Sequence, residues 1–535
     1  MPEWLTNVGM ILFVAFFFGF SVFIHEFGHL IAAVWRGLHV DKFSIGFGQR
    51  IIGFKRKGVD FIIGWLPFGG YVALPQMEPN EEPQTAEGKP LPSSKPLDRI
   101  IVALAGPLFN ILFAFVLGVV LWKSGKPASA PLEKITISDI PNKSSDYQAG
   151  LRTGDQIVSI NGKKISDTTQ MQKNYLFDEQ LTIDVIRDGK EISIGPFTPA
   201  KDPAFDLSLP LFNYDIDYKP VKAIVDKVPQ KDPSGTALPA AVAGILPGDQ
   251  FIKVNGKDIA YRSDVSKAIE NQKGEELTFT VLRNGEEVDI TIKPAKITSH
   301  IIGLSFINFP KIHQVSTEAT AFKAGIRRWD IFKTLNGKEY TNFENFEAEM
   351  DKHKGKMVNI GIERDGELMN FDVKNEYVRY MIGVQWQEYR VYDNPQTQFK
   401  DVFSETFQTL NAIVSRRVDP SNLSGPIGIS QGMFLQLKHL GWRACISFIF
   451  MINISLAVFN LLPLPVLDGG HIFIAMAELI SRRKIPIKFI QPVTMIFILF
   501  FFSLMIYVSL HDVKRAGFEI KSVQNTAVNK TATPC

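Results

Sequence analysis

Residues 8–35 read VGMILFVAFFFGFSVFIHEFGHLIAAVW, an almost wholly apolar stretch whose one formally charged residue is Glu26. About 20 consecutive apolar residues are enough for a helix to cross a bilayer. The stretch is too long for the core of a signal peptide, and no basic residue precedes it. It therefore predicts a helix that spans a membrane.

Three later segments share this character and contain no formally charged residue: 100–122, 444–467 and 489–510. One such run alone is compatible with a buried helix of a soluble core. Four in one chain indicate a polytopic α-helical membrane protein, with transmembrane helices at about 8–35, 100–122, 443–467 and 489–510.

The average composition hides these segments. The chain has 535 residues, with 58 Lys and Arg against 55 Asp and Glu, a net charge of +3 and a mean hydropathy of +0.05. The length predicts several domains. Binding of nucleic acid requires a concentrated excess of basic residues, so the near-neutral charge argues against that partner. Two cysteines exclude a disulfide framework.

Basic residues near the spans predict their orientation, because short cytoplasmic loops are enriched in Lys and Arg. Such residues follow the first span and precede the fourth: Arg36, Lys42, Arg50, Lys55, Arg56 and Lys57, then Arg482, Arg483, Lys484 and Lys488. Both loops are therefore expected in the cytoplasm. The long segment 123–443 and both termini are expected on the opposite side.

The long segment contains a repeated pattern. AGLRTGD at 149–155 recurs as AGILPGD at 243–249 and, more loosely, as AGIRRWD at 324–330. Each copy is followed by a polar helical stretch and then by an Asp-Gly or Asn-Gly pair between alternating apolar residues, at 188–189, 284–285 and 365–366. Such pairs are strong signals of a β-hairpin.

The three copies resemble PDZ domains of the bacterial type. The resemblance implies small α+β domains that bind extended peptides, such as peptide termini, by adding a strand to a sheet edge. The alternative, that they are spacers or steric filters, stays open. Trp329 replaces the glycine of the other copies, so the third repeat is the divergent one.

The first span also carries the pattern HEFGH. Positions i and i+4 share one face of a helix, so His25 and His29 can ligate the same metal ion, with Glu26 beside it as general base. An ionisable residue inside a span costs at least about 2.5 kcal/mol, which ordinary packing does not repay. The pattern therefore indicates a catalytic zinc site within the membrane.

A third protein ligand is needed, and NLLPLPVLDGGH at 460–471 offers it. Asp468 is the carboxylate of an apolar stretch that can approach the first span. The two prolines interrupt the helix, and the two glycines allow close backbone approach. His471 remains a rival ligand, although its offset from Asp468 is more typical of a residue behind the ligands.

Together these motifs resemble the site-2 protease family of intramembrane zinc metalloproteases. The resemblance covers nearly the whole chain and includes FSIGFG at 43–48, FGGYV at 68–72, AGPLFN at 105–110 and LSGPIGI at 423–429. It implies that His25, His29 and Asp468 bind Zn²⁺, that Glu26 is the base, and that Asn460 contacts the substrate backbone. The third repeat departs from the better-known members, which have two.

The expected fold is therefore four transmembrane helices, a membrane-associated β-hairpin or sheet, and inserted α+β PDZ-like domains. The predicted segments are an N-terminal membrane half 1–125 with a β region 40–75 and a flexible loop 75–98, repeats 132–220, 221–298 and 299–390, an amphipathic helix and connector 400–440, a C-terminal membrane half 441–512, and an extracytoplasmic tail 513–535.

A substrate helix must unwind before its peptide bonds can be attacked. An exposed strand edge in the β region could pair with the unwound segment, and the residues expected to contact substrate are Gly69, Gly70, Tyr71, Val72, Asn460, Pro463 and Pro465. Two plainer interpretations stay open: that Phe68 to Leu74 only anchor the chain at the interface, and that the amphipathic helix is only a connector.

The expected function is a zinc endopeptidase of the bacterial inner membrane that cleaves single-span membrane proteins near the cytoplasmic side, inside the lipid bilayer. The resemblance implies substrates trimmed by another protease, such as anti-sigma factors and leftover signal peptides, with extracytoplasmic PDZ-like domains gating access. The alternative is a non-catalytic membrane scaffold that presents these domains. An extracellular protease on an anchor does not fit, because HEFGH lies within the span.

Overall fold

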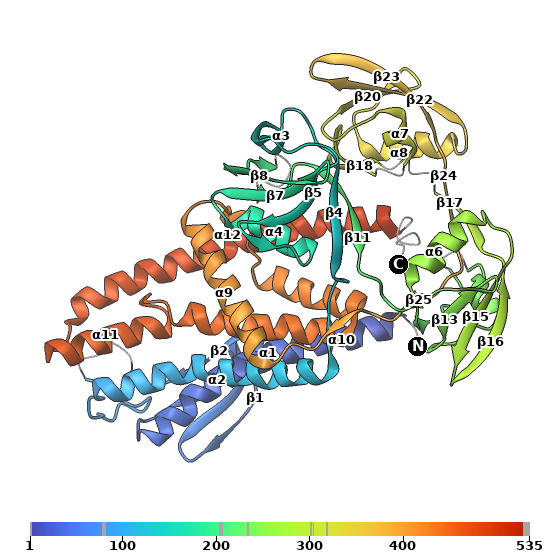
Figure 1. The fold of residues 1–535 in the computed structure, drawn as a ribbon. Coiled ribbons are helices and arrows are strands. Elements are labelled where there is room, and N and C mark those ends of the chain that lie inside the picture. Colours follow the sequence, from blue (N-terminus) through green and yellow to red (C-terminus); the bar gives the residue numbers. More distant parts are fainter. Residues whose placement is uncertain are drawn as a thin grey trace. The chain divides into compact units, whose positions relative to one another are not determined.

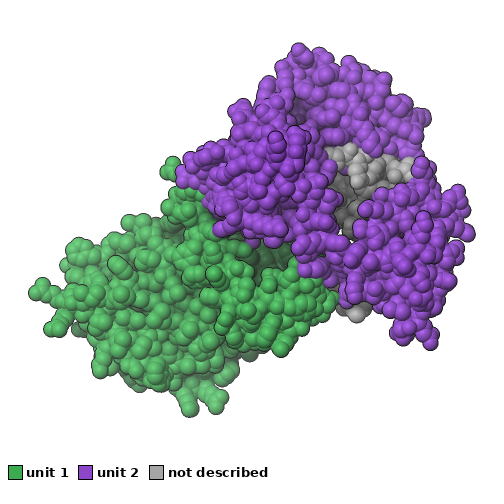
Figure 2. All heavy atoms as spheres, in the orientation of Figure 1, with its two compact units in different colours: residues 1–128, 390–520 green, residues 129–389, 521–535 purple. Residues whose placement is uncertain are grey.

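The computed structural model describes residues 3–77, 82–202, 207–232, 235–299, 302, 304–316 and 319–527. The chain forms two compact units, one from residues 1–128 and 390–520 and the other mainly from residues 129–389 (Figures 1 and 2).

The first unit consists of long helices and one hairpin. Its elements are α1 (Glu3–Trp35), β1 (Lys42–Arg56), β2 (Val59–Ala73), α2 (Pro96–Ser124), β3 (Lys126–Pro127), β26 (Arg390–Val391), α9 (Pro395–Val414), a 3-10 turn (Pro420–Asn422), α10 (Pro426–Asn460), α11 (Asp468–Ser481) and α12 (Ile487–Ala527). Helix α2 packs against α1, α9, α10 and α11. It is therefore the central helix of this unit.

The prediction of four long apolar helices is confirmed. Among the described residues, four helices are long and apolar enough to cross a membrane: 8–35 of α1, 96–124, 426–460 and 488–513 of α12. The third differs from the expected 443–467, because α10 starts at Pro426, breaks at Gly441 (φ 80°, ψ −178°) and ends at Asn460. The prolines that follow stop it, and α11 begins at Asp468.

Two other predicted segments also differ. The amphipathic helix was expected within residues 400–440. Helix α9 starts earlier, at Pro395, and ends at Val414. The predicted tail is helical as far as Ala527, and residues 528–535 lie outside the described residues, as do 78–81 of the loop predicted to be flexible.

The hairpin of β1 and β2 places a strand edge near α1. Residues 42–45 of β1 pair with 60–63 on one side and with 70–73 on the other. Residues 70–73 are thus an edge of this sheet in the described part of the chain. The sequence predicted a strand edge in this region.

The described part of the second unit contains three larger sheets, one for each repeat, and three two-stranded pairs. The first is built from β4 (Leu132–Asp139), β5 (Gln156–Ile160), β6 (Lys163–Lys164), β7 (Leu181–Arg187), β8 (Lys190–Phe197) and β11 (Asn213–Tyr218), with α3 (Ser145–Ala149) and α4 (Thr168–Phe177); the pair β9 (Lys201–Asp202) and β10 (Leu207–Ser208) stands apart. Its core is apolar, with Leu181, Ile183 and Val185 fully buried.

The second and third sheets repeat this plan. The second has β13 (Gln250–Val254), β14 (Lys257–Asp258), β15 (Leu277–Arg283) and β16 (Glu286–Ile292), with α5 (Pro239–Val242) and α6 (Arg262–Asn271). The third has β18 (Leu304–Asn308), β19 (Lys311–Val315), β20 (Ile331–Leu335), β21 (Lys338–Glu339), β22 (Met357–Arg364) and β23 (Glu367–Lys374), with α7 (Thr320–Ala324) and α8 (Phe343–Lys352).

The three hairpins predicted from Asp-Gly and Asn-Gly are confirmed as β7–β8, β15–β16 and β22–β23. Both turn residues have positive φ in each case, as at Asp188 (50°) and Gly189 (76°). Trp329 has a φ of 73°, close to the 93° of Gly154 at the equivalent position, so the divergent third repeat keeps the same backbone turn.

An ion pair recurs in all three repeats and explains the aspartate of the repeated pattern. The arginine before each hairpin turn pairs with that buried aspartate: Arg187 with Asp155, Arg283 with Asp249 and Arg364 with Asp330, at 2.6 to 2.8 Å. The same arginine donates to the carbonyl of the glycine that ends the preceding short helix, as Arg187 does to Gly150 at 2.8 Å. One residue pair thus ties the hairpin to the loop in each repeat.

The predicted C-terminal boundary of the third repeat, at 390, is wrong. Ile382 and Trp386 belong to the core of the second repeat. The strands beyond β23 also return to it: β24 (Tyr377–Met381) pairs with β17 (Ala295–Ser299), and β25 (Gln385–Trp386) pairs with β12 (Val225–Lys227). The third repeat is therefore inserted into the second.

Candidate metal centre

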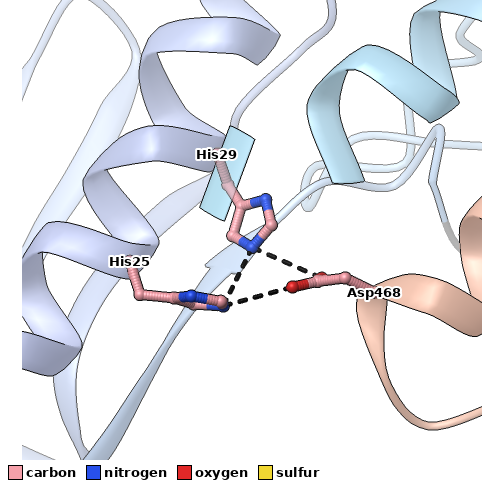
Figure 3. Close-up of side chains that lie close together, drawn as sticks. All are labelled: His25, His29 and Asp468. Carbon is pink, nitrogen blue, oxygen red and sulfur yellow. Dashed lines mark hydrogen bonds and ion pairs between the residues drawn. The ribbon is translucent and has the colours of Figure 1, made fainter. Parts of the chain in front are cut away.

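The two histidines of HEFGH lie on one face of α1, as the i, i+4 spacing requires. Both are buried, with 9% of His25 and 8% of His29 exposed. Their Nε2 atoms lie 3.2 Å apart (Figure 3).

Asp468 approaches this face from the first turn of α11 (Figure 3). Its Oδ2 lies 3.3 Å from Nε2 of His25, and its Oδ1 lies 3.4 Å from Nε2 of His29. The turn before α11 is tight, because a Cβ at Gly469 would lie 2.5 Å from the carbonyl carbon of Leu461, and one at Gly470 would lie 2.7 Å from Cα of Pro465. The glycines are therefore required for the backbone that presents the carboxylate.

These residues fit a zinc ion. The imidazole and carboxylate ligand atoms all lie within 4.8 Å of one another. Ligand atoms about 2.0–2.1 Å from one ion at tetrahedral angles lie about 3.3–3.4 Å apart. The two Nε2 atoms lie 3.2 Å apart, and each lies 3.3 or 3.4 Å from a different oxygen of the Asp468 carboxylate. In addition, the buried Oδ2 of Asp468 accepts no hydrogen bond from the described residues. A cation among these atoms would give this oxygen a partner.

A cavity of about 910 Å³ opens at these three side chains. Predicted site residues that line it are His25, Glu26, His29, Gly70, Tyr71, Val72, Asn460, Pro465 and Asp468. Gly69 and Pro463, although described, are not part of this lining. His471 lines the cavity but does not belong to the group of converging ligand atoms.

Glu26 lies between the histidines and the strand edge. Its carboxylate accepts a hydrogen bond from the backbone of Val72, and a Cβ at Gly70 would lie 3.1 Å from its Cγ. Asn460, the last residue of α10, brings its amide nitrogen to 3.4 Å from Nε2 of His25. The carboxylate, the strand edge and the amide therefore share one space with the converging ligand atoms.

The sequence pointed to this part of α2 only through the AGPLFN motif at 105–110, and it assigned no role to the residues that hold the imidazoles. The Nδ1 of His29 lies 2.8 Å from the carbonyl oxygen of Val102, and the Nδ1 of His25 lies 3.2 Å from the amide nitrogen of Asn110. A Cβ at Gly106 would lie 2.6 Å from Cε1 of His29. The signal available in the sequence was an amide side chain, that of Asn110, one helical turn after Gly106. The ion pair of Arg99 and Glu478 in the cavity wall was also not foreseen.

Comparisons with known proteins show the family of the chain. A family model described as Peptidase family M50 matches residues 13–504. Similar proteins include the Regulator of sigma E protease of Haemophilus influenzae, 26% identical over 87% of this chain and 89% of that protein. Protease RseP of Yersinia pestis is 25% identical over 86% and 89% of the two chains. A solved PDZ domain protein from Parabacteroides distasonis aligns at 10% identity over 47% of this chain and 95% of that chain, with a TM-score of 0.15.

Proposed function

The chain belongs to peptidase family M50, the site-2 protease family of zinc metalloproteases, and we propose that it hydrolyses peptide bonds within transmembrane segments of single-span membrane proteins. The observation that carries the proposal is the convergence of His25, His29 and Asp468, because two of these residues lie inside a helix apolar enough to span a bilayer. Polar side chains at such a position are costly and mark a function.

His25, His29 and Asp468 would hold the zinc ion, and Glu26 would act as general base. When bound, the ion supplies Lewis-acid chemistry: it polarises the scissile carbonyl and makes a water molecule more acidic. Glu26 lines the same cavity, so its carboxylate can take the proton of the attacking water and deliver it to the leaving amine.

The strand edge at 70–73 would hold the unwound substrate. In a helix the scissile carbonyl is engaged by the backbone, so the segment must become extended before attack. Residues 70–72 line the cavity together with Glu26, and the lining also includes Asn460 and Pro465. An extended substrate paired with the edge would thus lie within this cavity, with its backbone amides satisfied by the strand and by the Asn460 side chain.

The proposed orientation rests on charge, and the proposed location rests on the bacterial origin of the similar proteins. Basic residues after the first span and before the fourth would place both loops in the cytoplasm, and with them the cytoplasmic end of the cavity. Lys484 and Arg99 line the cavity. We therefore assign the enzyme to the bacterial inner membrane, with cleavage near the cytoplasmic leaflet and the repeats on the opposite side.

The substrates would be single-span proteins already shortened by another protease, including anti-sigma factor-like proteins and remnant signal peptides. This part of the proposal rests on the resemblance to the site-2 protease family, and the names of similar proteins, which refer to regulation of sigma E, support it. The three repeats would act as a gate that excludes bulky extracytoplasmic domains, with peptide termini as possible ligands of their sheet edges.

Cleavage of a model single-span substrate in proteoliposomes tests the proposal. The wild-type chain is expected to cut the substrate within its apolar segment, as mass spectrometry of the products would show, and a zinc chelator should stop the reaction. Asp468→Asn should also abolish cleavage, because it removes the anionic ligand. Lys253→Gln, in an exposed pair of the second repeat, serves as a matched control. Undiminished cleavage by Asp468→Asn would favour the non-catalytic scaffold, since the cleavage would then not depend on this centre. Cleavage outside the apolar segment would contradict hydrolysis within the membrane.

A further inference from the structure

Helix α2 supports both imidazoles from the side opposite Asp468. The Nδ1 of His29 lies 2.8 Å from the carbonyl oxygen of Val102. A carbonyl can only accept, so Nδ1 carries the proton and the lone pair of Nε2 is free toward Asp468. A metal ligand is commonly oriented in this way by a partner behind it.

His25 has a different partner. Its Nδ1 faces the side-chain amide of Asn110, with the nitrogen Nδ2 3.2 Å away. Asn110 is fully buried, and its oxygen Oδ1 has no hydrogen-bond partner among the described residues. If Nδ2 donated to Nδ1, the proton of the neutral imidazole would sit on Nε2, where it would face His29 and Asp468 and block a metal ion.

The opposite orientation of the amide gives the oxygen a donor and leaves Nε2 of His25 without a proton. The two ends of an amide have nearly the same shape, and the hydrogen-bond network decides which end faces a neighbour. With Oδ1 toward His25, the buried oxygen gains a donor, Nδ1–H, and the lone pair of Nε2 points at the other ligand atoms. Both histidines then present the same tautomer to one point.

We propose that Asn110 is a positioning residue for the metal centre: its Oδ1 accepts the Nδ1 proton of His25 and so fixes Nε2 as the ligand atom. The inference rests on the proposed function, since it concerns how the same centre is held. Asn110 does not touch the substrate or the reacting atoms, and its effect passes through His25 alone.

The placement on α2 supports this role. Val102, Gly106 and Asn110 follow one another at four-residue intervals and therefore lie along one face of the helix. A Cβ at Gly106 would lie 2.8 Å from Cε1 of His25 and 2.6 Å from Cε1 of His29. The glycine leaves room for both rings, and the groups one turn before and after it bond to them.

A second buried amide in the same unit provides the matched control. Asn453 is also fully buried, and it donates to the hydroxyl of Ser21 at 3.0 Å and to the carbonyl of Ile449 at 2.9 Å. Neither of these hydrogen bonds involves His25 or His29. Replacing it tests what the loss of a buried amide does to folding without touching the metal centre.

The test is the zinc dissociation constant of the full-length purified protein, measured by competition with a chromophoric chelator. Asn110→Leu keeps the approximate volume and removes the acceptor, so zinc should bind about 10- to 100-fold more weakly. Asn110→Asp keeps only acceptors, so it should bind zinc as tightly as the wild type or more tightly. Asn453→Leu should bind zinc like the wild type.

Each other outcome has a definite meaning. Wild-type affinity in Asn110→Leu would overturn the proposal, and so would an equal loss in Asn110→Leu and Asn110→Asp, because the amide N–H would then be the required group. If Asn110→Leu does not purify as folded protein, the comparison of Asn110→Asp with Asn110→Ala decides in the same way. Failure of the wild type itself to bind zinc would instead refute the proposed function.

Discussion

Replacing Gly106 by alanine places a methyl group against both imidazoles of the candidate metal centre. The new Cβ would lie 2.6 Å from Cε1 of His29 and 2.8 Å from Cε1 of His25. Carbon atoms pack best at about 3.5–4.0 Å, so the rings or the helix must move by about 1 Å. Zinc–ligand distances tolerate only about 0.2 Å.

The expected cost follows from these overlaps. Forcing one extra methyl group into a packed interior costs about 1–3 kcal/mol. If the two rings yield, this strain is relieved in the zinc-free state and opposes metal binding, which corresponds to about 5- to 150-fold weaker binding of zinc. Proteolytic turnover should fall at least as much, because the same shift misplaces the reacting groups.

The assay measures zinc affinity and cleavage of the model substrate on the same preparation. Gly19→Ala is the matched control, since it adds a methyl group to an α1 glycine with nothing within 4 Å of the new Cβ. Wild-type zinc affinity and turnover in Gly106→Ala would refute the close packing of α2 behind the histidines, and with it the geometry on which the role of Asn110 depends.

Three further predictions concern the rest of the chain. Asp155→Ala breaks the ion pair of the buried Asp155 with Arg187, which is 31% exposed. We therefore expect the first repeat to lose about 3 kcal/mol of stability. Hydrogen exchange of β5 and β7 in the full chain measures this loss, and unchanged protection would contradict it. Burial, aided by the charge of Arg328 and opposed by Asp202, lowers the pKa of His313 below its ordinary 6.5. The folded state therefore favours the neutral ring, and stability should fall as the pH drops below about 6.5. Hydrogen exchange in β19, corrected for intrinsic rates, should show protection that declines with falling pH, and His313→Gln should reduce this decline. Equal pH dependence of protection in the wild type and the variant would refute it. Asp512→Leu removes the carboxylate that accepts hydrogen bonds from the backbone N–H groups of Gly425 and Gly428 at 2.9 Å. Protection of residues 426–440 against hydrogen exchange should therefore drop by about 2 kcal/mol or more. Wild-type protection would show that this contact does not stabilise the start of α10.

The sequence was sufficient for the parts of the site that carry an unusual residue in an apolar context. His25 and Glu26 stand out within a span because charged or polar groups there need a reason. Asp468 stands out in the same way, and the structure brings it to the histidines. The hairpin turns could be predicted because Asp-Gly and Asn-Gly pairs favour positive φ at both positions.

The sequence was insufficient to predict contacts between distant segments and contacts made by an uncharged side chain. Asn110 carries no charge, and its importance depends on which face of α2 meets α1. The end of the third repeat was misplaced because β24 and Trp386 are separated from the second repeat by the inserted sheet, and no local pattern records that Trp386 packs with Phe251. Such pairings are set by tertiary packing.

We propose that Glu26 does acid–base chemistry at a zinc ion held by His25, His29 and Asp468 inside the membrane. The zinc content and the substrate turnover of Glu26→Gln, determined on one purified preparation in lipid, test this role. We expect about one zinc ion per chain, as in the wild type, together with a loss of turnover of about 10²- to 10⁴-fold. Turnover at the wild-type rate would contradict it.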